Sequence, residues 1–284
     1  MSNTKKLIIM VVILLVMSAI FNFLVRGSIR SAFTLPWASK DVSKTYEVKD
    51  SFKEIDVETD VSDITIIPIK NGKARVSRQG CSSLTFHLQT SGNKLTISDK
   101  DERLWFLRFG TNIGKTGLTL YLPEKDYQSL KVRTATGSVN VQSGFHCEDA
   151  ELKSDTGSVT VSSAKFSDDL EVKTSTGRVS LSGIRADDLS VKTATGSIKL
   201  SDVIVSEGME VKSDTGSVEL VKCDGAKIKI KTDTGRISGT LLTGKAFDVK
   251  SDTGRVNIPD SVSFGGTCEI KSDTGSITIE IAGK

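Results

Sequence analysis

Ser213-Asp214-Thr215-Gly216-Ser217-Val218 is one copy of a stretch that recurs through the second half of this 284-residue chain. Thr-Gly, followed by one residue and then Val or Ile, occurs at intervals of 19 to 21 residues. The glycines of this motif are Gly137, Gly157, Gly177, Gly196, Gly216, Gly235, Gly254 and Gly275. A period this regular is typical of a repeat architecture in which each repeat stacks on its neighbours.

Apolar and polar residues alternate on both sides of each glycine. With the glycine as position zero, positions −7, −5 and +2 are apolar and position −3 is always Ser or Thr. The residues between them are polar, and position −4 is always basic. This period-two pattern predicts two short, half-buried strands in each repeat. The Thr-Gly between them is the predicted corner, because glycine adopts backbone conformations that are closed to other residues.

A strand pair of about 20 residues cannot bury its apolar face alone, whereas stacked pairs share a continuous core. We therefore predict an all-β fold, a single-stranded parallel β-solenoid with about eight regular coils over residues 128–284. Residues 46–127 also alternate, but with irregular spacing, and are predicted to form the amino-terminal part of the same solenoid. There Ser62 occupies the corner position in place of glycine.

The amino terminus holds an apolar run of 19 residues, Leu7 to Val25, interrupted only by Ser18 and Asn22. This length just spans a bilayer core and exceeds the apolar region of most signal peptides, and no small-x-small cleavage site follows it. We predict an uncleaved transmembrane helix at 7–25, a cytoplasmic segment at 1–6 and a juxtamembrane linker at 26–45. Basic residues are nearly balanced across the span. We expect the carboxyl-terminal domain outside the cell, since long domains translocate largely regardless of flanking charge.

The overall charge argues against a nucleic-acid partner. The formal net charge of the chain is +3. Residues 129–284 hold 20 Lys and Arg against 22 Asp and Glu, so the solenoid lacks the basic footprint that nucleic acid requires.

A basic row at position −4 is the most distinctive predicted surface feature. One interpretation is a ligand-facing ladder that binds an anionic polymer such as a teichoic acid, or lipid headgroups. The other is a solvated face neutralised by acids at position −6 and by the corner aspartates. The row consists of Arg133, Lys153, Lys173, Lys192, Lys212, Lys231, Lys250 and Lys271.

The sequence predicts no catalytic residue, cofactor or metal ligand. Asp-Thr-Gly resembles an aspartic protease motif, but catalysis needs two converging carboxylates, and here the triplet recurs at repeat spacing. Its aspartates are Asp155, Asp214, Asp233, Asp252 and Asp273. Calcium along this row is an alternative, although calcium needs six to eight oxygen ligands and the neighbouring lysines compete for the carboxylates. His87 and His146 are isolated in the sequence.

The stretch Leu118–Val141 and the repeats after it resemble the bacterial "putative adhesin" β-strand-repeat family, whose function is unknown. The resemblance covers about residues 46–284, and together with one amino-terminal span the layout is similar to LiaG-type proteins linked to cell-envelope stress. It implies a β-repeat fold and supplies no catalytic residues.

The sequence therefore favours a non-enzymatic, membrane-anchored protein whose rod binds a wall component or an envelope partner. A polysaccharide-active β-solenoid enzyme and a cytoplasmic, membrane-tethered scaffold that polymerises through its coil ends remain as alternatives. The four cysteines are predicted to be free thiols. Cys223 and Cys268 occupy positions that aliphatic residues fill in other repeats, which is a common role for buried free cysteine.

Overall fold

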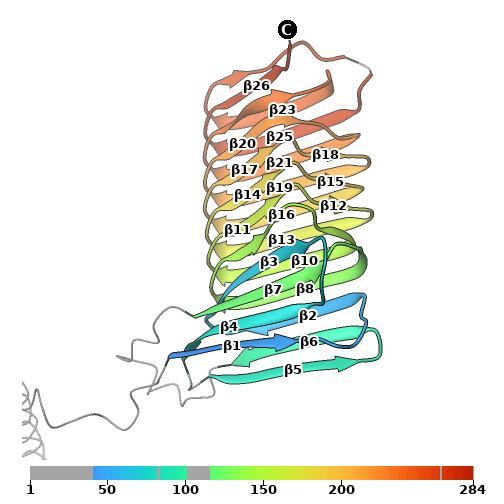
Figure 1. The fold of residues 1–284 in the computed structure, drawn as a ribbon. Coiled ribbons are helices and arrows are strands. Elements are labelled where there is room, and N and C mark those ends of the chain that lie inside the picture. Colours follow the sequence, from blue (N-terminus) through green and yellow to red (C-terminus); the bar gives the residue numbers. More distant parts are fainter. Residues whose placement is uncertain (1–40, 82–83, 101–115, 263, 284) are drawn as a thin grey trace, which may run out of the picture. The chain divides into compact units, whose positions relative to one another are not determined.

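Every element in the part of the chain that the structure describes is a β-strand (Figure 1). The structure is a computed structural model, and it describes residues 41–81, 84–100, 116–262 and 264–283. The predicted transmembrane helix at 7–25 lies outside these residues. Within them, no helix long and apolar enough to cross a membrane is present. The described residues belong to one structural unit that begins at Asp41.

The strands follow one another at short intervals along the chain. They are β1 (Asp41–Glu47), β2 (Glu54–Thr59), β3 (Asp63–Ile69), β4 (Arg75–Cys81), β5 (Thr85–Ser91), β6 (Lys94–Lys100), β7 (Gly117–Pro123), β8 (Asp126–Thr136), β9 (Val139–Val141), β10 (His146–Thr156), β11 (Val159–Ser162), β12 (Lys165–Phe166), β13 (Asp169–Thr176), β14 (Val179–Ser182), β15 (Arg185–Ala186), β16 (Asp188–Thr195), β17 (Ile198–Ser201), β18 (Ile204–Val205), β19 (Gly208–Thr215), β20 (Val218–Cys223), β21 (Lys227–Thr234), β22 (Ile237–Leu241), β23 (Ala246–Thr253), β24 (Val256–Asn257), β25 (Thr267–Thr274) and β26 (Ile277–Ile281).

Each regular repeat forms one coil, which we name by its corner glycine. The residues before the glycine add a strand to a 14-stranded sheet, here the wide sheet, and those after it add a strand to a 12-stranded sheet, here the narrow sheet. Three coils have a third short strand (β12, β15 or β18) that also pairs in parallel. Successive coils pair residue on residue, so that Leu170 lies between Ala150 and Leu189. The predicted parallel β-solenoid is confirmed.

The core runs continuously through the stack. Side chains at positions −7, −5, +2 and +4 point inward, and in most coils they are almost completely buried; in the coil of Gly216, for example, Met209, Val211, Val218 and Leu220 are at most 1% exposed. These four side chains belong to a single hydrophobic cluster that includes the inward residues of most other coils. The predicted alternation thus defines the inner and outer faces of every coil.

The corner glycines stack directly on one another. Seven of the eight have φ between +150° and +159°, a region that is essentially restricted to glycine. A Cβ on Gly216 would also lie 2.6 Å from the carbonyl carbon of Gly196 in the coil below. Gly137, which does not share the positive φ, stacks on the carbonyl group of Ser62. The predicted corners, including Ser62 as a substitute, are therefore confirmed.

The invariant Ser or Thr at position −3 holds each corner to the one below. Its hydroxyl donates a hydrogen bond to the carbonyl oxygen of the stacked corner residue, at 2.8 to 3.5 Å in all eight regular coils. Ser154 Oγ, which is buried, donates to Gly137 O at 2.8 Å. This geometry, repeated in every regular coil, explains why position −3 is inward-facing yet polar.

The amino-terminal part belongs to the same stack but does not follow chain order. β2 lies between β6 and β8, and β3 lies between β7 and β9. β1, β4 and β5 pair antiparallel to their neighbours, unlike the coil strands. β1 begins at Asp41, so the predicted linker at 26–45 extends too far by five residues. The amino-terminal coil is therefore inserted between two segments that follow it in the sequence.

The last two coils are exchanged in order, so the coils do not all stack in the order of the sequence. β25 and β26, from the coil of Gly275, pair with β21 and β22, and β23 and β24 pair on the outside of them (Figure 1). Stacking in sequence would put Ile277–Ile281, the last strand in the chain, at the exposed edge. That strand is interior, and the terminal strands are β23 and β24.

The three cysteines whose side chains the structure describes are free and buried, as predicted: Cys147, Cys223 and Cys268. Burial raises the pKa of Cys147 and of Cys268 to about 12. These thiols behave as small apolar core residues rather than as reactive groups.

Candidate functional site

The basic side chains at position −4 stack in register on the outer face of the wide sheet. Lys153 pairs with Arg133 on one side and Lys173 on the other. At the carboxyl-terminal end, Lys271 lies between Lys231 and Lys250. The structure thus brings together the whole predicted ladder, namely Arg133, Lys153, Lys173, Lys192, Lys212, Lys231, Lys250 and Lys271.

Each member of this ladder has an acidic partner. The pairs are Arg133–Glu151, Lys153–Asp155, Lys173–Glu171, Lys192–Glu210, Lys212–Asp214, Lys231–Asp233, Lys250–Asp252 and Lys271–Glu269, with nitrogen–oxygen distances up to 3.7 Å. A hydrogen bond to Asp233 raises the pKa of Lys231, and one to Asp252 raises the pKa of Lys250. Such exposed pairs contribute little to stability, but they neutralise the row. The geometry favours the paired, solvated face over a free anion-binding strip.

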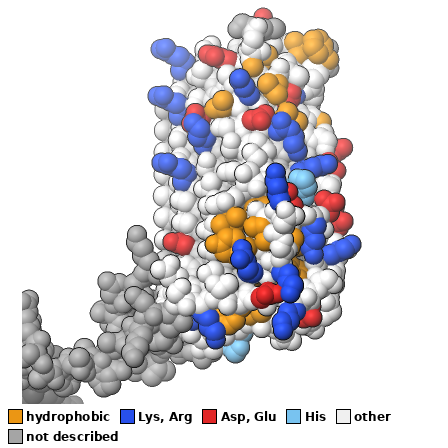
Figure 2. Space-filling view, in the orientation of Figure 1, with side chains coloured by type: hydrophobic (Ala, Val, Ile, Leu, Met, Phe, Trp, Pro, Cys, Tyr) orange, Lys and Arg blue, Asp and Glu red, His pale blue; other side chains and the backbone are white. Residues whose placement is uncertain are grey.

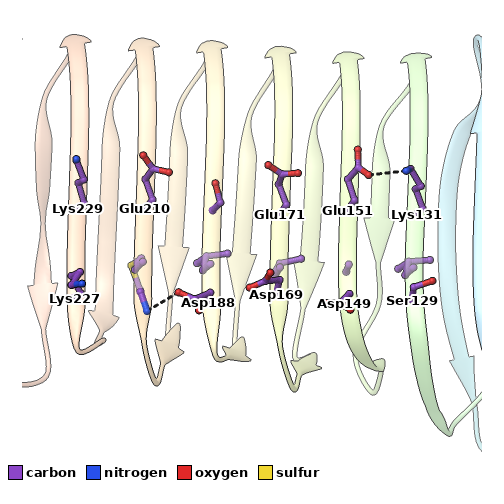
Figure 3. A pocket seen from close by; sticks show the side chains of 17 residues that line it. Ser129, Lys131, Asp149, Glu151, Asp169, Glu171, Asp188, Glu210, Lys227 and Lys229 are labelled. Carbon is purple, nitrogen blue, oxygen red and sulfur yellow. Dashed lines mark hydrogen bonds and ion pairs between the residues drawn. The ribbon is translucent and has the colours of Figure 1, made fainter.

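A long groove with a volume of about 720 Å³ lies beside this ladder. It crosses the strands from β8 to β21, a length of about 24 Å at the spacing of adjacent strands. Figure 3 shows two rows of side chains along it. One row is at position −8 (Ser129, Asp149, Asp169, Asp188, Gly208 and Lys227) and the other at position −6 (Lys131, Glu151, Glu171, Ser190, Glu210 and Lys229). Residues at position −7, whose side chains point into the core, lie between the two rows and line its floor; of these, Ala150 is 4% exposed.

The groove is acidic in its middle and basic at both ends (Figure 3). Several of its acids are already paired: Glu151 accepts hydrogen bonds from Arg133, and Asp188 accepts one from the backbone of Gly208. Partial burial by itself would raise the pKa of Glu151. Hydrogen bonds from Arg133 and Lys131 outweigh it and hold that pKa below its usual value. Asp149 and Asp169 have no such cationic partner among the residues that the structure describes, so the unneutralised charge in the middle of the groove is negative.

Three exposed carboxylates meet at one side of the groove, where Asp149, Asp168 and Asp169 offer oxygens within 4.8 Å of one another. Burial, followed by the charges of Asp168 and Asp188, raises the pKa of Asp169. A calcium ion requires six to eight oxygen ligands, and these three carboxylates would supply only part of that set. The residues present therefore do not assign a metal site.

A second hollow lies on the narrow sheet near the carboxyl-terminal end, with a volume of about 480 Å³. Arg236 and Arg255 line it together with the hydroxyl residues Ser238, Ser276 and Thr278. None of the described residues that line this hollow is a carboxylate. The exchanged coil order accounts for this hollow. The coil of Gly275 lies between the coils of Gly235 and Gly254, so the small side chain of Ser276 separates Arg236 from Arg255.

Sequence reasoning identified the ladder but missed the groove. Its −8 row could have been noticed from Asp149, Asp169 and Asp188, which recur at repeat spacing. The two histidines do not contribute to it: the nearest ionic partner of His146 is Asp126, at 3.7 Å, and His87 is on β5.

The chain is similar to solved structures of bacterial proteins. One described as a "putative lipid binding protein" from Parabacteroides distasonis is 16% identical, with a TM-score of 0.56, and the match covers 84% of this chain and 97% of that one. "Putative adhesin" structures from Bacteroides fragilis and Parabacteroides distasonis are each 14% identical, with TM-scores of 0.47 and 0.48. Those matches cover 86% and 85% of this chain and 99% and 98% of the others.

The family comparison covers nearly the whole described unit. No curated protein is similar to the chain in sequence. The model of the Toastrack family, DUF4097, matches residues 52–203 and again 164–284. The repeated coils, the glycine corners and this match lead to the same conclusion: the chain belongs to the Toastrack DUF4097 family.

Proposed function

We propose that this protein is a non-enzymatic binding protein of the bacterial envelope, anchored by its amino-terminal helix and binding an extended ligand in the long groove of the wide sheet. The observation that supports this most is the shape of the groove, which crosses β8 to β21 without interruption and is shallow rather than enclosed. A site of this form fits a chain-like ligand better than a small molecule, which is usually enclosed on most sides.

The proposed anchor is the apolar run at 7–25, with the β-solenoid on the outer side of the membrane. The support is the length of the run and the lack of a cleavage site after it. The test is extraction with alkaline carbonate, which should leave the protein in the membrane fraction, together with protease treatment of intact cells, which should remove the solenoid. Loss from the membrane would contradict the anchor, and protection from protease would favour the cytoplasmic scaffold.

The charge of the groove restricts the ligand. The basic ladder is the other candidate for binding an anionic wall polymer, but each of its members is paired with an acid in the structure. The groove itself is acidic in the middle. We therefore expect an extended wall component or partner segment that is neutral or carries amino groups, and we expect anionic polymers and anionic lipid headgroups to bind less well.

The experiment is co-sedimentation of the full chain, in detergent micelles, with purified peptidoglycan from which anionic polymers have been removed. Asp169→Lys places a positive charge in the middle of the groove and should weaken binding, whereas Asp155→Lys, on the same sheet but outside the groove, should not. Binding that requires the anionic polymers, or that Asp169→Lys leaves unchanged, would contradict the groove as the site. Vesicles of anionic lipid provide the comparison for lipid binding.

One observation favours an enzyme as the second candidate. Asp169, with its raised pKa, lies beside Asp149 and Asp168 in a groove that could hold a polysaccharide. Glycoside hydrolysis uses one protonated and one ionised carboxyl group, in retaining enzymes about 5 Å apart. Release of soluble fragments from the same peptidoglycan, abolished by Asp169→Asn, would establish the enzyme and refute the binding protein.

Capture of partners from cells under envelope stress would test the proposed link between this protein and envelope stress.

A further inference from the structure

The carboxyl-terminal end of the solenoid is an unpaired end. β23 pairs only with β25, and β24 pairs only with β26, and no other described strand lies on their outer sides. An unpaired edge of this kind presents backbone donors and acceptors to any further strand.

Side chains of the terminal coil are more exposed than their equivalents in the coil beneath it, because no further coil covers them. Val256 is 40% exposed, whereas the residue at the same position of the coil stacked beneath it, Ile277, is fully buried. Lys250 is 70% exposed, whereas Lys271 in the adjacent coil is 48% exposed. The three large hydrophobic residues that are exposed in the described part of the chain are Leu242, Val256 and Phe264, all in this carboxyl-terminal region. Hydrophobic side chains are visible at the upper end in Figure 2. One more coil on this end would cover Val256 and part of Lys250.

The backbone of β23 is available for pairing at Val249 and Ser251. Ala246 donates to Gly266 on the β25 side, so the backbone groups of Val249 and Ser251 point to the open side, because successive residues of a strand alternate in direction. The alternation ends at the corner, where Thr253 O accepts from Gly275 N on the β25 side. The first half is covered: Ser261 Oγ accepts from Phe247 N at 2.9 Å, and Val262 N donates to Lys245 O at 2.9 Å. Pairing is therefore open around Ser251.

The charges on this edge are self-complementary. Asp248, Lys250 and Asp252 alternate on the outer face of β23. In an antiparallel pair of two β23 strands centred on Ser251, Lys250 of each copy lies opposite Asp252 of the other, and opposite charges in this position are stabilising. The outermost strand of the wide sheet at the other end, β5, contains no Asp, Glu, Lys or Arg. Charge therefore favours pairing of two identical ends over head-to-tail pairing.

We propose that two copies of this protein associate end to end through antiparallel pairing of β23 with β23 of the second copy, forming a two-fold symmetric dimer that continues both sheets across the interface. The interface is isologous and closes with two copies, as symmetric pairing of one surface with itself requires. This inference goes beyond the proposed ligand binding and does not depend on it.

The test is a charge swap at this edge, measured by light scattering of the full chain in detergent micelles over a range of protein concentrations. The wild type should form a dimer. Lys250→Asp places like charges opposite each other twice in the dimer and should weaken association by about tenfold or more. Lys250→Asp combined with Asp252→Lys restores opposite charges and should recover association. Lys212→Asp, at the same position of an interior coil, should not change it. Far-ultraviolet circular dichroism checks that each variant is folded.

Three outcomes would overturn the proposal. They are a wild type that stays monomeric at the highest concentration, a Lys250→Asp variant that associates as well as the wild type, and a double variant that fails to recover. Assemblies larger than two copies would likewise contradict a closed dimer and would point to head-to-tail pairing.

Discussion

Replacing the corner glycine Gly216 with alanine tests the central feature of the fold. Its φ of +152° is in the region restricted to glycine, so alanine there costs about 1–3 kcal/mol in backbone strain. The new Cβ would also lie 2.6 Å from the carbonyl carbon of Gly196, so the two coils must separate locally. That movement breaks the hydrogen bond from Ser213 Oγ to Gly196 O, at 3.3 Å, and strains the backbone bond between the same two coils from Gly196 N to Thr215 O, at 2.9 Å.

At about 1 kcal/mol for each hydrogen bond, the total cost of Gly216→Ala is about 4 kcal/mol, a large part of the roughly 5–15 kcal/mol that typically stabilises a domain. Gly92 provides the control, because it has φ of +58° but a Cβ added there would have no atom within 4 Å. Gly92→Ala should therefore cost only about 1–2 kcal/mol. Lys212→Ala should stay within about 0.5 kcal/mol, since its pair with Asp214 is half exposed.

The measurement is the free energy of unfolding from urea titrations of the full chain in detergent micelles, followed by circular dichroism. The expected order of destabilisation is Gly216→Ala, then Gly92→Ala, then Lys212→Ala. Equal losses for the two glycine variants would refute the reasoning, because they would show that stacking of carbonyl groups at the corner adds nothing to the cost of the dihedral angle.

Three further predictions concern buried or crowded polar groups. The ammonium group of Lys245, 1% exposed, shares its three N–H donors among the oxygens of Asp224, Thr243, Gly225 and Gly265, so Lys245→Met should cost about 3 kcal/mol in unfolding free energy; a loss below about 1 kcal/mol would contradict this. Because the folded-state pKa of Asp169 is raised by burial and by Asp168, its ionisation makes the native state less stable as pH rises through that pKa. Asp169→Asn should therefore raise the melting temperature at pH 7, and the gain should shrink as pH falls toward 3.8, the ordinary value; a constant gain would count against the assignment. The thiols of Cys147, Cys223 and Cys268 are buried, so iodoacetamide should label them only after unfolding, and mass spectrometry would reveal either early labelling or a linked peptide.

The sequence predicts the internal geometry of each coil well because that geometry is local. Alternation fixes which side chains face inward, and a corner with glycine at its apex needs no information from distant residues. Position −3 illustrates the limit: its invariant Ser or Thr is evident from the repeat, but its role requires the stacked neighbour, because the acceptor of Ser154 is Gly137 in another coil.

The groove was not predicted, although its residues are part of the repeat. Position −8 varies from Ser129 through three aspartates to Lys227, so no single repeat marks it as a site. The groove exists only because parallel, in-register stacking aligns those positions across several strands. The ladder at position −4 could be predicted because all its members are basic. Its neutralisation by acids at two different positions depends on side-chain conformation, which the repeat pattern does not specify.

The exchanged coil order has a different origin. The inward residues of the coils are so similar that each coil could stack on almost any other, and the alternation that specifies the faces of a strand says nothing about which coil is its neighbour. What distinguishes the end is Lys245, whose ammonium group binds the 224–225 turn and the Gly265 loop together. These contacts hold the chain that leaves the coil of Gly235 beside the chain that enters the coil of Gly275. They therefore favour insertion of that coil beneath the coil of Gly254. A single buried lysine, the only one among the described residues, thus ties the exchanged segments together next to the edge strand that a second copy would use.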